Sequence, residues 1–183
     1  MDPLLLTPAD VDTARWELCG DPERSWAAYG GAMRMYRFAL GRTWDVSKPS
    51  ALWILLNPAT ADHDSDDRTT LRLAGYAESW GCGGFVVVNL FALRSSDPKR
   101  LRYAPDPVGP GNDEVVLRAA TLSGFDPVCG WGNQGALRGR AQAVTEMLAT
   151  NGVTLTALAV TALGSPSHPL YLPRYLTPSP WQP

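Results

Sequence analysis

Two short apolar runs, each followed by an asparagine, stand out in the pattern of hydrophobic and polar positions. Residues 51–56 and 85–88 are apolar at every position and lead into Asn57 and Asn89. Runs of this length without alternation are typical of strands buried on both faces of a parallel sheet. Between them, residues 66–80 carry apolar side chains at helical spacing. The pattern predicts a strand–helix–strand unit.

The rest of the chain continues this alternation around a long loop. Residues 95–113 are rich in Pro, Gly and Asp and predict an irregular loop of a length that is often functional. The other expected elements are a half-buried strand at 33–38, a helix at 114–122, a short strand at 127–131, a helix at 137–150, a strand at 153–163 and a proline-dense tail from 166 onward. We therefore expect an α/β fold, with three α/β/α layers and a mostly parallel central sheet. Residues 1–183 are interpreted as a single domain whose last part, 173–183, is a Pro-rich tail.

Composition narrows the class of protein. The 183 residues are 45% hydrophobic and 19% charged, which disfavours disordered and coiled-coil proteins. No apolar run is long enough to cross a bilayer, and the start at Met1 lacks the basic segment of a signal peptide. We expect a cytoplasmic protein without a membrane partner. Cys19, Cys82 and Cys129 are widely spaced and predict buried thiols rather than a disulfide framework or a zinc site.

The net charge of −2 gives no overall positive field for nucleic acid. A small nucleotide or nucleoside is therefore the expected ligand. DNA or RNA remains an alternative, which would require a local basic patch on the surface. No cofactor is expected.

Candidate ligand-binding residues follow the predicted strands, because ligands of such sheets bind outside the carboxyl ends of the strands. Asn57, held by Pro58, can present its amide to a cleft, although this motif taken alone favours an Asx turn that leaves the strand. Asn89 ends the second strand, with Phe91 available to stack on a planar ligand and Arg94 to bind an anion. The alternative is that Asn89 satisfies loop amides and Phe91 belongs to the core.

Two later segments add candidates. A glycine-rich turn around Trp131 precedes a helix start with Arg138 and Arg140, where a phosphate could bind, or where Trp131 simply packs in a tight turn. His168 lies in a proline-flanked loop followed by Tyr171, and a histidine held in this way can act as a general acid or stabilise an anion.

An acidic segment offers a metal-binding alternative. Its carboxylates are Asp62, Asp64, Asp66 and Asp67, and His63 lies among them. Carboxylate oxygens can bind Mg²⁺ or Ca²⁺, but the spacing is not that of an EF-hand. A solvated loop with a helix cap is the favoured interpretation, and a metal-dependent hydrolase remains an alternative.

Taken in order, four segments resemble motifs of the uracil-DNA glycosylase-like superfamily. They are Leu56-Asn57-Pro58, the strand from Gly84 to Asn89, the segment from Val128 to Gly132, and His168-Pro169-Leu170. The resemblance implies that Asn89 reads the base and that the fold is uracil-DNA glycosylase-like. Many glycosylases have an aspartate where this chain has Asn57, which can orient water but cannot take its proton.

Residues 35–173 are also similar to a bacterial family of unknown function. Its motifs LNPSTAD, DDPT, VNLFAYRATDP, DPVGPEND and HPLYL correspond here to residues 56–62, 66–69, 88–98, 106–113 and 168–172. That family has a Thr-Lys-x-Gly stretch before HPLYL, which is shortened here to residues 163–167 and has no lysine.

Together these resemblances favour an enzyme that recognises a nucleobase and cleaves or remodels an N-glycosidic bond in a nucleotide, a nucleoside or nucleic acid. Asn57 and His168 are the expected catalytic residues, whereas Asn89, Phe91, Arg94, Trp131 and Tyr171 are the expected substrate-binding residues. A non-catalytic nucleobase-binding module remains the first alternative.

Overall fold

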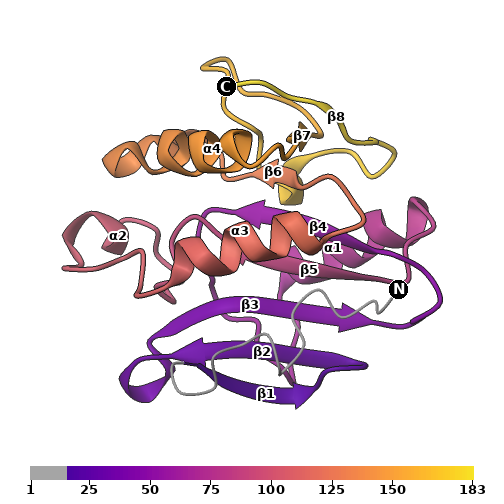
Figure 1. Ribbon diagram of the computed structural model, residues 1–183, viewed down its shortest axis with the longest axis horizontal. Helices are drawn as coiled ribbons and strands as arrows, with labels where there is room; N and C mark the ends of the chain where they lie inside the picture. The colour runs from indigo at the N-terminus through magenta and orange to yellow at the C-terminus, as the bar shows by residue number, and fades with distance from the viewer. Residues whose placement is uncertain (1–15) are drawn as a thin grey trace.

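The computed structural model describes residues 16–183, whose strands form one eight-stranded sheet (Figure 1). The order across the sheet is β1-β2-β3-β5-β4-β6-β7-β8. The strands are β1 (Glu17–Asp21), β2 (Ser25–Gly30), β3 (Tyr36–Thr43), β4 (Ser50–Leu55), β5 (Gly84–Asn89), β6 (Val128–Gly130), β7 (Thr156–Ala157) and β8 (Ser179–Pro180).

Strand direction divides the sheet into two parts. β5, β4, β6 and β7 are paired in parallel, whereas β1, β2 and β3 form an antiparallel meander that joins the sheet at β5. β8 pairs antiparallel with β7, so four of the seven pairs among the described strands are antiparallel. The mixed α/β class is confirmed, but the expectation of a mostly parallel sheet is wrong. The meander escaped prediction because β1 and β2 show no regular alternation of apolar and polar residues.

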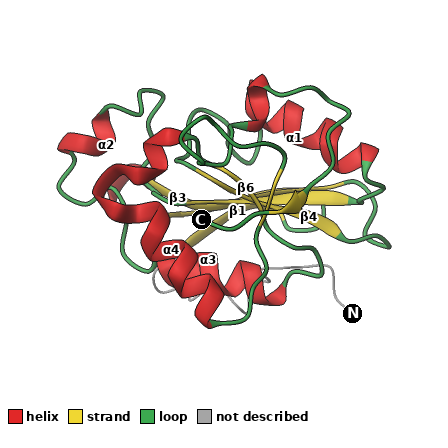
Figure 2. Cartoon of the chain, turned by 90° about the horizontal axis from the view of Figure 1, so that it is seen from above, coloured by secondary structure: helices red, strands yellow, loops and turns green. Residues whose placement is uncertain are grey.

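Helices lie on both faces of the sheet (Figure 2). α1 (Arg68–Ser79) covers one face, and α3 (Asn112–Leu122) and α4 (Arg140–Thr150) cover the other. α1 starts where the Asp67 carboxylate accepts hydrogen bonds from the backbone N–H groups of Thr69 and Thr70, both at 2.9 Å. The Thr70 hydroxyl in turn accepts from the backbone N–H of Asp67, which completes a capping box.

The two covered faces explain the continuous apolar runs. Along β4, Leu52 and Ile54 pack into the core beneath α3 and α4. Trp53 and Leu55 point to the opposite core, beneath α1. Every position of such a strand is buried, and alternation is absent from the sequence for that reason.

Two expected strands differ from the structure. The strand expected at 153–163 is reduced to β7, because the chain turns back where the Thr161 N–H donates to the Ser165 carbonyl at 2.8 Å. The strand expected at 33–38 begins only at Tyr36. Met33 and Arg34 have a positive φ of 54° and belong to a short 3₁₀ turn.

The helices expected at 66–80 and 114–122 are confirmed as α1 and α3. The helix expected at 137–150 begins at Arg140, after a 3₁₀ segment, Asn133–Gly139. The long loop contains a short helix, α2 (Arg100–Tyr103).

The tail from residue 172 onward is bound to the body of the fold. Tyr76 Oη of α1 donates to the carbonyls of Leu172 at 3.2 Å and Pro173 at 2.8 Å. Trp80 Nε1 donates to the Leu176 carbonyl at 3.1 Å. The tail then adds β8 to the edge of the sheet.

Cys82 and Cys129 are buried, as predicted, whereas Cys19 is only half-buried. Burial raises the pKa of the Cys129 thiol well above its usual value and keeps it protonated. None of the described helices is long and apolar enough to cross a membrane. The segment at Met1, on which the expectation of a missing signal peptide rests, lies outside the described residues.

Candidate functional site

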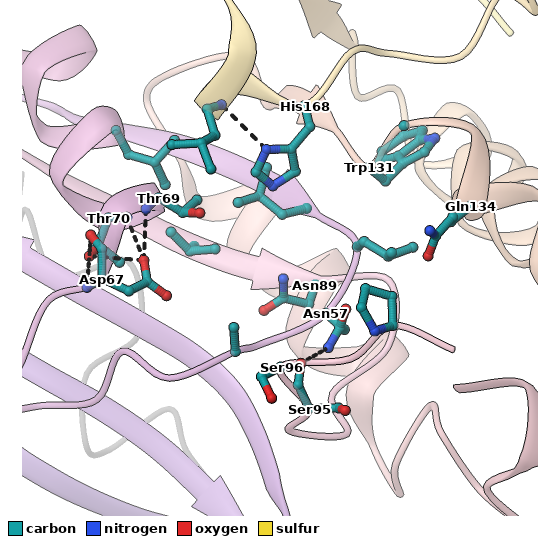
Figure 3. Close-up of a pocket in the computed structure, with 18 of the residues that line it drawn as sticks. Asn57, Asp67, Thr69, Thr70, Asn89, Ser95, Ser96, Trp131, Gln134 and His168 are labelled. Carbon is teal, nitrogen blue, oxygen red and sulfur yellow. Dashed lines mark hydrogen bonds between the residues drawn. The ribbon is translucent and has the colours of Figure 1, made fainter. Parts of the chain in front are cut away.

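A cavity of about 440 Å³ lies where β4, β5 and β6 end. Asn57 follows β4, Asn89 ends β5, and Trp131 follows β6. The start of α1, the loop at 95–98 and the loop at 168–171 also line it (Figure 3). The cavity is large enough for a small organic ligand.

Five of the seven expected site residues contribute to this pocket. They are Asn57, Asn89, Trp131, His168 and Tyr171. These residues come from segments up to 114 positions apart in the sequence, since Asn57 and Tyr171 are its two ends. Tyr171 is 82% exposed and lies at the rim.

Phe91 and Arg94 lie elsewhere. Phe91 is fully buried in the core beneath α3, beside Leu90. Arg94 lies over the ring of Tyr29, 5.3 Å from its centroid, and donates to the Arg34 carbonyl at 3.3 Å. Neither side chain lines the pocket, so we do not retain stacking by Phe91 or anion binding by Arg94.

The side chain of Asn89 has a hydrogen-bond acceptor without a partner in the described part of the chain. It is 1% exposed, and its Oδ1 atom is buried without a hydrogen-bond partner among the described residues. Its position is fixed through the backbone, because Asn112 Nδ2 donates to the Asn89 carbonyl at 2.9 Å. A buried amide oxygen without a partner costs free energy unless a ligand or water pairs with it.

The side chain of Asn57, unlike that of Asn89, donates two hydrogen bonds to backbone carbonyls. Its Nδ2 atom donates to the carbonyls of Pro58 at 3.0 Å and Ser95 at 2.9 Å. Both amide hydrogens are thereby committed, and the strand end is tied to the loop that starts at Ser95. Only the Oδ1 atom of Asn57 remains to contact a ligand or water.

Asp67 is the carboxylate of the pocket wall (Figure 3). Its Oδ1 atom accepts hydrogen bonds from the two N–H groups at the start of α1, and its Oδ2 atom accepts a long one from the Ala61 N–H, at 3.4 Å. The sequence placed Asp67 in the acidic segment and did not connect it with Asn89 and His168. The Asp-x-x-Thr capping pattern of residues 67–70 was the available signal, because it predicts where the helix, and therefore this carboxylate, begins.

His168 is held firmly in the pocket wall. Gly130 of β6 permits the approach of its loop, since a Cβ there would lie 2.8 Å from Cδ of Pro169. The Ser167 N–H donates to the Ala159 carbonyl at 2.8 Å. Burial lowers the pKa of His168, and the charge of Asp67 offsets this only in part. The imidazole is therefore neutral near neutral pH.

Arg37 was not predicted as a site residue. It comes from β3, lines the pocket and is 4% exposed. Its Nη1 atom donates to the Ala61 carbonyl, whereas Nε has no partner among the described residues. Burial lowers its pKa to about 10, with Tyr29 and Asp67 acting in the opposite direction.

The expected phosphate site at Arg138 and Arg140 is not formed. Arg138 donates to the carbonyls of Arg102 at 3.1 Å and Ala104 at 2.8 Å. Arg140 donates to the Leu90 carbonyl at 2.7 Å and pairs with Asp113. Both guanidinium groups hold loops together, and neither lines the pocket.

The acidic segment does not assemble a metal site. Asp62 accepts from the N–H groups of Asp64 and Ser65 within its own turn, and Asp66 pairs with Arg42 at 3.0 Å. Asp67 caps α1. In residues 16–183 no group of three or more His, Cys, Asp or Glu side chains is placed to hold a metal ion.

Comparison with known protein families identifies most of the chain. Residues 37–170 match the family described as a protein of unknown function (DUF1643). No curated protein and no solved structure matches the chain.

Proposed function

The chain belongs to the DUF1643 family, and we propose that it is a nucleobase-recognising enzyme that hydrolyses an N-glycosidic bond. The substrate class is a nucleotide, a nucleoside or nucleic acid. The four segments that resemble the uracil-DNA glycosylase-like superfamily support this proposal, because Asn57, Asn89, Trp131 and His168 line one pocket.

Asn89 carries the proposal. A planar base edge presents donors and acceptors in one plane, and an amide side chain can pair with it through one acceptor and two donors. The Oδ1 atom of Asn89 is buried without a partner. A base N–H pairing with that atom would satisfy it, which gives the pocket a reason to select a base over an apolar ring.

We assign the role of general base to Asp67, because the amide of Asn57 cannot take a proton from water. In the proposed reaction, Asp67 takes a proton from water while the water oxygen attacks the anomeric carbon. The carbon–nitrogen bond breaks and its electron pair leaves with the base. The Oδ1 atom of Asn57 orients the water, and His168 donates a hydrogen bond to the departing base anion.

Purified full-length protein is incubated with a panel of nucleosides, 5′-nucleotides and uracil-containing DNA, and free base is measured by chromatography. We expect base release from at least one substrate, lost in Asp67→Asn. His63→Ala serves as a control, because His63 does not line the pocket. Tight binding without release would favour the non-catalytic module, and neither binding nor release across the panel would contradict the proposal.

A further inference from the structure

Arg37 places a positive charge in the pocket wall that the described protein groups do not neutralise in an ion pair. Within residues 16–183, carboxylates pair with Arg34, Arg42, Lys48 and Arg140, and none pairs with Arg37. Asp67 lies close enough to affect the pKa of Arg37 but forms no ion pair with it. A charge buried in this way is costly unless an opposite charge approaches it.

The hydrogen bonds of Arg37 are also incomplete. The guanidinium has five N–H donors, and the Nη1 atom donates a hydrogen bond to the Ala61 carbonyl. Nε is buried without a partner, and Nη2 makes no hydrogen bond to a described residue. A guanidinium whose Nε and Nη2 groups have no protein partner matches two oxygens of a phosphate group.

Asp67 does not fill this role. Its Oδ1 atom is committed to two N–H groups of α1. Its Oδ2 atom accepts a hydrogen bond from the Ala61 N–H at 3.4 Å. The carboxylate is thus held by the helix start, and the arginine is held by the neighbouring carbonyl, so the two charges stay apart on the same wall.

We propose that Arg37 binds an anionic phosphate of the ligand, so that the pocket selects a phosphorylated nucleotide over the corresponding nucleoside. This inference rests on the proposed function for the nucleobase, and it adds the second group that the ligand must carry. A cavity of about 440 Å³ leaves room for a sugar phosphate beside a base.

Calorimetry of the full chain with uridine, uridine 5′-monophosphate and inorganic phosphate tests the inference. We expect the monophosphate to bind roughly 10- to 100-fold more tightly than uridine. This is the gain in affinity that a hydrogen bond to a charged group typically gives. Arg37→Gln should lose this preference for the monophosphate over uridine, and Arg37→Lys should keep part of it.

Arg94→Gln is the matched control, because it removes a half-buried arginine that lies outside the pocket. It should keep the full preference. A short uracil-containing oligonucleotide shows whether an internal phosphodiester can replace the terminal phosphate.

The outcomes separate the two proposals. Binding of inorganic phosphate that depends on Arg37, without binding of any nucleoside or nucleotide, would support the phosphate site and contradict the nucleobase. Equal affinity of wild-type protein for uridine and its monophosphate would overturn the phosphate site, whether or not the Arg37 variants fold. A preference that persists in Arg37→Gln would overturn it as well.

Discussion

The Nδ1 atom of His168 accepts a hydrogen bond from the backbone N–H of Leu170, at 3.3 Å. A neutral imidazole carries its hydrogen on one nitrogen only, so this contact assigns the hydrogen to Nε2. Burial lowers the pKa of His168 and favours that neutral form. His168 therefore offers the pocket a hydrogen-bond donor without a full positive charge.

Replacing this donor should impair the reaction more than binding. In His168→Ala we expect turnover to fall on the order of 10²-fold, with substrate affinity nearly unchanged, because the hydrogen bond strengthens as charge develops on the departing base. Steady-state kinetics with separate kcat and KM values measure this. His63→Ala, which changes the other histidine, should behave as wild type, and unchanged turnover in His168→Ala would remove His168 from the mechanism.

The lowered pKa of His168 also predicts how stability depends on pH. The unfolded chain binds a proton on this side chain near its ordinary pKa of ~6.5, whereas the folded chain does so only at lower pH. The free energy of unfolding should therefore decrease as the pH falls from that value through the lower folded pKa. Urea unfolding at a series of pH values should show a smaller decrease in His168→Gln than in the wild type. An identical slope in both would mean that His168 titrates normally in the folded state.

Asp67 has a structural and a chemical role that two substitutions separate. Asparagine caps helices about as well as aspartate, so Asp67→Asn should keep the stability of α1 while reducing base release at least ~10²-fold. Asp67→Ala should lose the same activity and, in addition, about 1 kcal/mol of stability. Thermal unfolding and the base-release assay are compared on both variants. Full activity in a folded Asp67→Asn protein would exclude Asp67 as the base.

Asn89 is expected to set the base preference. Asn89→Asp removes the amide donors, so the pocket should reject a uracil-type edge and accept the amino group of a cytosine-type base. Because unpaired buried groups make such discrimination large, the preference should shift by ~10⁴. Relative binding of uracil-type and cytosine-type nucleotides to the two proteins measures this shift. If both proteins prefer the same base to the same degree, Asn89 only shapes the turn.

The salt dependence of binding distinguishes a small ligand from a polymer. A nucleotide whose phosphate contacts Arg37 releases few counterions, so its affinity should change little between about 50 and 200 mM salt. A polymer held by many cations would lose roughly 10³-fold or more over that range. Binding isotherms at several salt concentrations decide the point, and we expect the shallow slope.

The sequence located the pocket better than it identified the residues in it. Asn57 and Asn89 were found because two continuous apolar runs predict parallel strands, and the carboxyl ends of such strands share one edge. Phe91 was wrongly predicted to line the pocket. Side chains of β5 alternate between the two faces of the sheet, but after Asn89 both Leu90 and Phe91 enter the same core. No periodicity predicts such a change of direction.

Arg37 escaped prediction for a related reason. In the alternating segment at 33–38, a charged residue is interpreted as facing solvent. In the structure the segment before α1 lies against that side, where Arg37 donates to the Ala61 carbonyl, and the arginine is buried. Arg37 and Ala61 are 24 positions apart in the sequence, and the pattern did not reveal their contact. Long-range pairing of this kind is not encoded in any local window of the sequence.

The tail from Leu172 to β8 covers both an aromatic stack and a strand edge. Beneath it, Trp80 stacks on the rings of Trp53, Tyr76 and Phe125. β7 has only two residues, and β8 occupies its free side. Local opening of the tail, without unfolding of the rest, would expose aromatic surface and unpaired backbone groups together. Self-association at raised temperature is therefore expected to begin there, with amide hydrogens at β7 exchanging before those of β4 and β5.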